Sequence, residues 1–168
     1  MVDITELQVR KDDLAKSRII SRTASLNDGD VLAKKLNEKH GVEALAVQAD
    51  IGKAEDVKAM GEKIIQRFGT VHVLINNAAV GWGNPIDSYN DDEWYKTLDV
   101  NVTGAYFCTK FVLEHMKKQQ WGRIINISSI QGKFGFPYTG AYAVSKHGII
   151  GLGRVTAAEV AKHGITVN

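Results

Sequence analysis

Residues 71–77 read VHVLINN, and this stretch decides the fold. Its first five residues form an apolar run that ends in two amides, as is typical of a strand covered on both faces. Residues 54–68 lead directly into this run and carry apolar side chains at helical spacing. A helix that runs straight into a buried strand predicts a parallel α/β sheet.

The same alternation of helix and strand extends through the chain. Short apolar runs predict further strands at residues 18–21, 44–49, 122–127 and 165–167. Amphipathic stretches predict helices at residues 30–39, 54–68, 91–119 and 138–161, the first ending near Gly41. We expect the chain to end at Asn168 before its last strand can contribute to the sheet. The predicted fold class is a doubly wound α/β parallel sheet in a single domain that spans residues 1–168.

The composition is that of a globular domain with a core: 168 residues, 44% hydrophobic and 24% charged, with a formal net charge of +2. This near-neutral charge, with no Lys/Arg cluster among aromatic residues, gives no electrostatic footprint for nucleic acid or an anionic membrane, so we exclude both as partners. No apolar run reaches the roughly 18 residues of a spanning helix, and the N-terminus has no apolar signal region. A cytoplasmic protein is therefore expected.

The cysteine and histidine content excludes several kinds of site. The single cysteine, Cys108, rules out an internal disulfide and a CxxC site, and its neighbours Phe107 and Phe111 predict burial. The five histidines never pair at metal-ligand spacing, so we predict no metal site.

Polar residues stand at the carboxyl ends of three predicted strands, where parallel sheets carry their sites. Asp50 ends one strand, Asn76 and Asn77 end the next, and Ser128 and Ser129 end a third. Such residues also end strands simply because they make turns. Three strand ends that carry them favour a functional site at this edge of the sheet.

Tyr142 and Lys146 are four residues apart and follow Ser129, which closes an apolar strand. On a helix this spacing places a phenol and an ammonium side by side. Tyr106 and Lys110 have the same spacing, but they lie inside a predicted helix without a strand end at the matching distance before them. We interpret that second pair as a helix face.

The side chains of Ser129, Tyr142 and Lys146 suit proton transfer at an alcohol or a ketone. A phenol is a poor base at neutral pH, but a nearby ammonium favours the phenolate form. A serine hydroxyl can donate to the substrate oxygen and stabilise the charge that develops there. Because none of these side chains can accept a hydride, the redox step requires a cofactor, most simply a nicotinamide.

Residues 17–168 resemble the short-chain dehydrogenase/reductase family. The motifs that carry the resemblance are Asp50-Ile51, Asn76-Asn77-Ala78-Ala79, Asp99-Val100-Asn101-Val102, Ile125-Asn126-Ile127-Ser128-Ser129, Tyr142-Ala143-Val144-Ser145-Lys146 and Gly164-Ile165-Thr166-Val167-Asn168. The resemblance implies a Rossmann-like dinucleotide-binding and catalytic domain, a homo-oligomer, and an NAD(P)-dependent oxidoreductase that interconverts a secondary alcohol and a ketone. It implies a small-molecule substrate of the 3-oxoacyl, 3-hydroxybutyrate or sugar-alcohol type.

Four catalytic residues follow from the resemblance. It implies that Asn101 holds a water relay, that Ser129 polarises the carbonyl, that Tyr142 is the general acid or base, and that Lys146 also binds the nicotinamide ribose.

The cofactor site is likewise implied by the resemblance. Its expected residues are Ser21, Arg22, Asp50, Ile51, Asn77, Ala78, Ala79, Tyr142 and Lys146. Asp50 and Ile51 would contact the adenine. The family usually has glycine at the position of Ala79, whose methyl group should crowd the cofactor slightly. Ser21 and Arg22 end the strand that discriminates the two nicotinamide cofactors, and no acid is adjacent, which favours NADP over NAD. The alternative is that Arg22 is a solvated surface charge.

The largest departure from the family is the absence of its glycine-rich phosphate turn before residues 18–21. The pattern resumes after a gap of roughly 25 residues, so we expect an incomplete sheet that lacks its first strand and its last strand region and has unpaired edges. Residues 4–9 are a candidate replacement strand, although residues 10–13, RKDD, form no glycine turn.

Two functions therefore stay open. The first is the NAD(P)-dependent oxidoreductase. The second is a catalytically inactive truncated fragment or pseudoenzyme with at most a subunit-pairing role, which the missing turn favours.

Trp82, Phe134 and Phe136 lie on predicted loops beyond strand ends, where they either line an apolar substrate pocket or anchor the loops.

Overall fold

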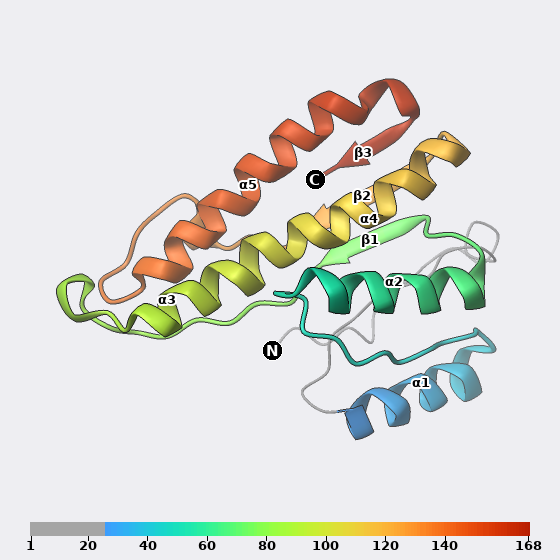
Figure 1. The fold of residues 1–168 in the computed structure, drawn as a ribbon, viewed down its shortest axis with the longest axis horizontal. Helices are drawn as coiled ribbons and strands as arrows, with labels where there is room; N and C mark the ends of the chain where they lie inside the picture. Colours follow the sequence, from blue (N-terminus) through green and yellow to red (C-terminus); the bar gives the residue numbers. More distant parts are fainter. Residues whose placement is uncertain (1–25) are drawn as a thin grey trace.

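The computed structural model describes residues 26–168, and its helices and strands alternate along the chain (Figure 1). The helices are α1 Leu26–His40, α2 Ala54–Phe68, α3 Asp91–Leu98, α4 Gly104–Gln119 and α5 Gly140–Val160. The strands are β1 Val73–Asn76, β2 Gly122–Asn126 and β3 Ile165–Val167. The predicted strand at residues 18–21 and the candidate replacement strand at residues 4–9 lie outside the described residues, as do Ser21 and Arg22.

The three strands form one parallel sheet in the order β1-β2-β3. In the β1–β2 ladder Leu74 stands opposite Ile124, and in the β2–β3 ladder Gly122 stands opposite Ile165. The prediction of a parallel α/β sheet is confirmed. The prediction that the strand at residues 165–167 cannot contribute is wrong, because three paired residues suffice to dock it on β2.

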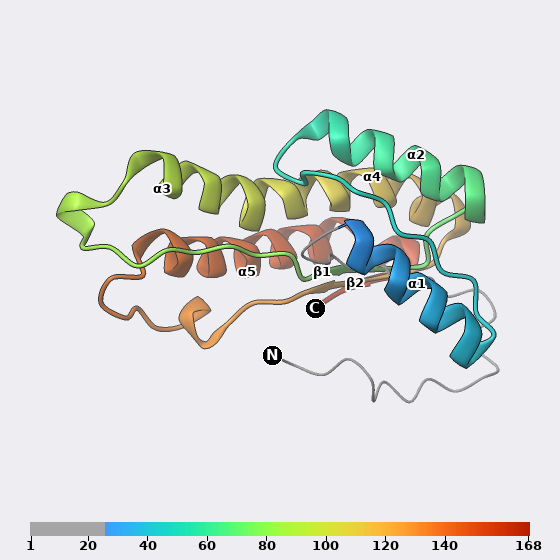
Figure 2. The ribbon, with the colours of Figure 1, turned by 90° about the horizontal axis from the view of Figure 1, so that it is seen from below.

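The core lies between the sheet and the helices α2, α4 and α5. Its buried residues come from all three helices and all three strands: Val57, Met60, Ile64, Val71, Leu74, Cys108, Val112, Met116, Ile124, Val160 and Ile165. The view in Figure 2 shows α2, α4 and α5 stacked over the same side of the strands. Because alternate side chains of a strand point to opposite faces, the inward residues of β1 and β2 pack against these helices.

The opposite face of the sheet is not covered to the same degree. Ile125 and Ile127 alternate with the buried Ile124 and are 37% and 41% exposed. On β1 itself the side chains of Val73 and Ile75 are half-buried and Leu74 is buried, so the prediction that the first apolar run forms a strand covered on both faces is not contradicted for the described residues. An apolar run establishes that a strand is apolar on both sides, but it does not supply the layer that covers each side.

Residues 44–49 do not form the predicted strand. A strand needs a neighbour for its backbone groups, and among residues 26–168 the only strand beside β1 is β2. The backbone at the two ends of this segment bonds to side chains instead: Ala44 N donates to Asn37 Oδ1 and Asp50 N to Asp56 Oδ2. Its apolar residues Val47 and Ala49 still pack against the core, which explains their pattern.

The predicted helix at residues 91–119 is confirmed, with one feature that the sequence did not predict. Asn90 caps the start of α3, because its side chain accepts a hydrogen bond from Glu93 N. Between α3 and α4 the residues Asp99–Thr103 form one turn of π-helix that buries Asn101. Such π-turns within α-helices often mark functional sites.

Candidate active site

Tyr142 and Lys146 lie together near the start of α5. The Lys146 ammonium is 5.4 Å from the centre of the Tyr142 ring. The lysine is only 4% exposed, and its Nζ donates to the backbone carbonyl of Ile127 at 2.8 Å. The predicted pairing of phenol and ammonium on one helix face is therefore present, and the end of β2 holds the ammonium in place.

Burial lowers the pKa of Lys146, because the charged form loses its hydration. An ammonium has three N–H donors. Among the described residues, the Ile127 carbonyl is its one hydrogen-bond acceptor. Lys146 thus retains donors for the hydroxyl groups of a ligand, as the predicted ribose contact requires.

The loop after β2 is fixed to α5 at Lys146. Ser128 Oγ donates to the Lys146 carbonyl at 3.0 Å, so this lysine is held through both its main chain and its side chain. Gly132 makes the close approach possible, since a Cβ there would lie 2.4 Å from Ser128 Oγ and 2.8 Å from the Lys146 carbonyl oxygen. The sequence predicted that Ser128 ends a strand, but it did not predict the hydrogen bond from Ser128 to the Lys146 carbonyl.

Ser129 follows at the N-cap of the short 3₁₀ helix Ile130–Gly132. Its Oγ accepts a hydrogen bond from Gln131 N at 3.2 Å. A hydroxyl that accepts in this way still has its own proton to donate. Ser129 can therefore donate to a substrate oxygen, which is the role that the sequence predicts.

The Asn101 side chain makes three hydrogen bonds within the protein. Its Oδ1 accepts from Val80 N at 2.8 Å, and its Nδ2 donates to the Val80 carbonyl at 2.8 Å and to Ser145 Oγ at 2.9 Å. Both amide protons are consumed by these bonds. The side chain ties the loop after β1 to α5, and a water relay at Asn101 stays a prediction.

A second group of predicted site residues lies before α2. Asp50 Oδ1 accepts from Gly52 N at 3.1 Å, and its Oδ2 accepts from Lys96 Nζ at 2.8 Å. The hydrogen bond from Lys96 lowers the pKa of the Asp50 carboxyl. Ile51 packs closely against Gly104, since a Cβ at Gly104 would lie 2.8 Å from the Ile51 side chain.

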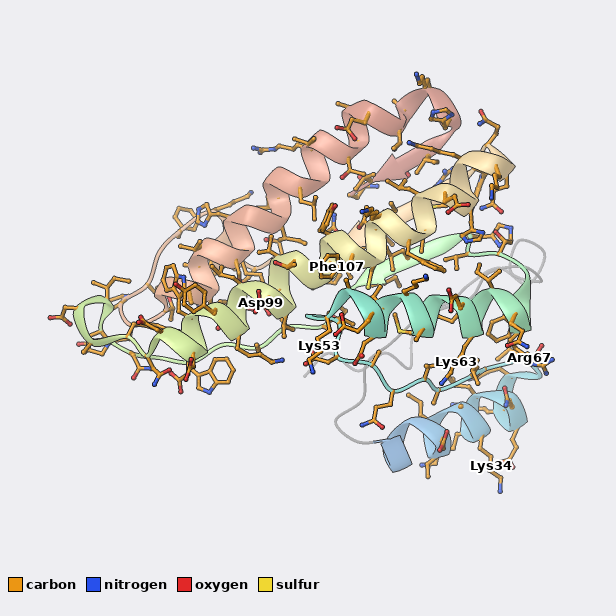
Figure 3. The ribbon with its side chains drawn as sticks, viewed as in Figure 1. Lys34, Lys53, Lys63, Arg67, Asp99 and Phe107 are labelled. Atoms are coloured by element: carbon orange, nitrogen blue, oxygen red, sulfur yellow. The ribbon has the colours of Figure 1, made fainter. Side chains whose placement is uncertain are left out.

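The two groups of site residues meet at the π-helix that carries Asn101. A Cβ at Gly52 would lie 3.4 Å from the Cβ of Asp99, the first residue of that helix. Figure 3 labels Asp99 at the junction of α3 and α4, and Lys53 at the start of α2. The structure therefore joins the segment of Asp50 and Ile51 to the helix that reaches the catalytic candidates.

The amides that end β1 and β2 form a small hydrogen-bond network with α4. Asn76 Nδ2 donates to Thr109 Oγ1 at 3.2 Å and to Asn126 Oδ1 at 2.8 Å. The neighbouring Asn77 is exposed, while Ala78 and Ala79 are half-buried. Asn76 thus fixes the strand ends, and a cofactor contact of Asn77, Ala78 and Ala79 stays a prediction.

The remaining predictions have mixed outcomes. Cys108 is buried, as predicted. No group of three metal-ligating side chains occurs within residues 26–168. In the same part of the chain, no helix is both long and apolar enough to cross a membrane. The aromatic residues Trp82, Phe134 and Phe136 are exposed and so lie outside the core, and a substrate pocket that they line stays a prediction.

Comparisons with known proteins agree with this geometry. A model of the short chain dehydrogenase family matches residues 13–168. A 3-oxoacyl-[acyl-carrier-protein] reductase of Staphylococcus epidermidis is 36% identical over 149 residues, which are 89% of this chain and 61% of that protein. An uncharacterized oxidoreductase of Bacillus subtilis is 41% identical over 136 residues, 81% of this chain and 52% of that protein.

A solved structure gives the same result at the level of the fold. The crystal structure of an NAD+-bound xylitol dehydrogenase matches with a TM-score of 0.82 at 34% identity, over 86% of this chain and 55% of that one. The chain thus spans between half and two thirds of the length of these relatives.

Proposed function

Because this chain belongs to the short chain dehydrogenase family, we propose that the protein is an oxidoreductase that interconverts a secondary alcohol and a ketone with a nicotinamide cofactor. One observation carries the proposal. The buried ammonium of Lys146 lies over the Tyr142 ring, and the loop that presents Ser129 is bonded to the same lysine. This arrangement suits a reaction in which a proton moves at an oxygen atom.

The proposed mechanism assigns one task to each side chain. Ser129 donates a hydrogen bond to the substrate oxygen and stabilises the negative charge that develops on it. Tyr142 gives the proton to that oxygen in reduction and removes it in oxidation. Lys146 places its buried positive charge 5.4 Å from the centre of the Tyr142 ring, where it can stabilise negative charge that develops during proton transfer.

The described residues fit a nicotinamide cofactor at its ribose. When bound, the cofactor supplies or accepts the hydride. Lys146 has N–H donors left for the ribose hydroxyls. Asp50 and Ile51 are the proposed adenine contacts, and Asn77, Ala78 and Ala79 the proposed lining. We keep NADP ahead of NAD on the basis of Ser21 and Arg22.

The substrate is proposed to be a small ketone or alcohol with an apolar group next to the reacting carbon. The support is the exposed aromatic side chains of Trp82, Phe134 and Phe136. A reductase of 3-oxoacyl groups is among the relatives, and a dehydrogenase of the polyol xylitol is among the similar structures. The aromatic residues favour the first kind of substrate. Self-association and a cytoplasmic location stay predictions.

The competing proposal is an inactive protein that only pairs with other subunits. Its support is the lack of a glycine-rich phosphate turn in the sequence. The two proposals differ in whether the purified protein binds a nicotinamide nucleotide.

The experiment is a titration of the purified protein with NADPH and with NADH, followed by nucleotide fluorescence. Ketone reduction is then measured by nucleotide absorbance for wild type and for Ser129→Ala. We expect binding by both proteins and a turnover that is about 100-fold lower in the variant, as for the loss of one donor to a developing oxyanion. No binding of either nucleotide at millimolar concentration would refute the enzyme proposal.

A further inference from the structure

Ser145 lies between Tyr142 and Lys146 on α5 and is fully buried. Its hydroxyl takes part in two short hydrogen bonds. Ser145 Oγ donates to the backbone carbonyl of Tyr142 at 2.7 Å and accepts from Asn101 Nδ2 at 2.9 Å. The hydroxyl therefore links the main chain of Tyr142 to a side chain from the π-helix.

The link continues to the loop after β1. The same Asn101 amide exchanges two hydrogen bonds with the backbone of Val80, as donor and as acceptor. Gly81, the next residue, contacts the Tyr142 ring so closely that a Cβ there would lie 2.8 Å from the ring. Tyr142 is thus held at its backbone through Ser145 and at its ring by Gly81, and both restraints originate at the Asn101 amide.

We propose that Ser145 is a positioning residue for Tyr142. Its hydroxyl does not touch the substrate. It fixes the tyrosine relative to the π-helix and the loop after β1, so that the phenol stays in the place that proton transfer requires. The inference rests on the proposed function for its catalytic consequence, whereas its structural part concerns this chain alone.

The alternative is that the hydroxyl contributes only to the stability of α5. The helix offers a matched control for this case. Thr156 is also on α5 and is also buried, and its hydroxyl donates to the Leu152 carbonyl at 2.8 Å. Ser145→Ala and Thr156→Val therefore each remove one buried hydroxyl that bonds to the preceding turn, but only the first also removes the bond to Asn101.

The first measurement compares kcat and KM for ketone reduction in the two variants, at a temperature well below both unfolding midpoints. We expect Ser145→Ala to lower kcat by roughly tenfold to a hundredfold, as small displacements of a reacting group do, while KM and nucleotide affinity change less than about threefold. Thr156→Val should keep the wild-type kcat. Equal effects of the two variants on kcat would overturn the positioning role.

The second measurement does not depend on activity. Tyrosine is labelled with ¹³C at its ring carbon ζ, and the Tyr142 resonance is assigned by its loss in Tyr142→Phe. We expect Ser145→Ala to shift or broaden this resonance and Thr156→Val to leave it unchanged. An unchanged Tyr142 resonance in Ser145→Ala would overturn the inference. If wild type proves inactive, the proposed function fails, and this spectrum alone decides the place of Ser145.

Discussion

Two Tyr-x-x-x-Lys pairs lie on neighbouring helices, Tyr142 with Lys146 on α5 and Tyr106 with Lys110 on α4. In both pairs the ammonium lies over the ring, at 5.4 Å and 5.8 Å from its centre. Lys146 is 4% exposed and bonded to the loop after β2, whereas Tyr106 is 42% exposed and Lys110 is exposed as well. The i, i+4 spacing therefore brings phenol and ammonium together in both pairs. Only in the pair on α5 does a strand end, at Ile127, pack against the lysine and shield its ammonium from water.

The largest predicted difference between the pairs concerns turnover. Lys146→Met removes the buried charge and the proposed ribose donor, so ketone reduction should fall by about 100-fold or more. Lys110→Met removes a solvated charge on the exposed face of α4 and should change the rate by less than about twofold. Steady-state rates of both variants at matched nucleotide saturation provide the measurement. Similar losses in the two variants would remove the distinction between the pairs.

The second prediction concerns the buried side of α4, the helix that exposes Tyr106 and Lys110. Burial raises the pKa of Cys108 from 9.0 to about 11. The unfolded chain therefore releases this proton at a lower pH than the folded chain. The contribution of the neutral Cys108 thiol to the free energy of unfolding is fully present below about pH 9. This contribution should fall by about 3 kcal/mol as the pH rises to about 11.

Denaturant unfolding of wild type and Cys108→Ala at several pH values measures this contribution. The difference between the two free energies of unfolding should shrink steadily across that range. A difference that stays constant with pH would show that the thiol is not buried as described. In the native state the thiol should also react slowly with thiol reagents, because the thiolate is the reactive form.

The third prediction concerns the two lysines and pH. Burial lowers the pKa of Lys146, so over the range between its folded pKa and the ordinary value of 10.5 the unfolded chain binds more protons than the folded chain. The contribution of Lys146 to stability should rise with pH across this range, opposite in sign to the contribution of Cys108, and the cost of the buried ammonium should be fully present below it. The rise should be absent in Lys146→Met and retained in Lys110→Met, as measured by the same unfolding series.

The smallest predicted effect concerns Ser128, whose hydroxyl holds the carbonyl of Lys146. Ser128→Ala should lower the free energy of unfolding by about 1 kcal/mol, as for the loss of one partly buried hydrogen bond. Ser88→Ala is the matched control, because Ser88 is exposed and bonds weakly to Asp87 at 3.4 Å. Thermal unfolding of Ser128→Ala and Ser88→Ala measures the difference between their effects on stability. An equal effect of both substitutions would mean that the loop after β2 is not fixed through Ser128.

The sequence predicted most of the fold on which this comparison rests. Helical periodicity located α2 at the correct residues, and apolar runs located β1, β2 and β3 to within two residues. The run at residues 44–49 failed because strand formation depends on a neighbouring strand, which a local pattern cannot contain. The π-turn at Asp99–Thr103 was missed because its sequence, DVNVT, carries the ordinary signs of a helix.

The site was predicted in part for the same reason. Ser129, Tyr142 and Lys146 could be named because each has a chemical use and a place relative to a strand end. Ser145 and Val80 could not, since a serine within a helix and a backbone amide gain their tasks only from the contacts with Asn101. Three-dimensional contacts therefore add the residues that hold the site, while the sequence indicates the residues that would perform its chemistry.

Ketone reduction by Tyr142→Phe and Tyr106→Phe, measured side by side with wild type, decides whether the pair on α5 alone takes part in proton transfer. Each substitution removes one phenol hydroxyl and keeps the ring. We expect Tyr142→Phe to lose turnover by about 1,000-fold or more and still to bind the nucleotide, because only the proton donor is gone, and we expect Tyr106→Phe to keep the wild-type rate. Full activity in Tyr142→Phe, or equal losses in both variants, would contradict this expectation.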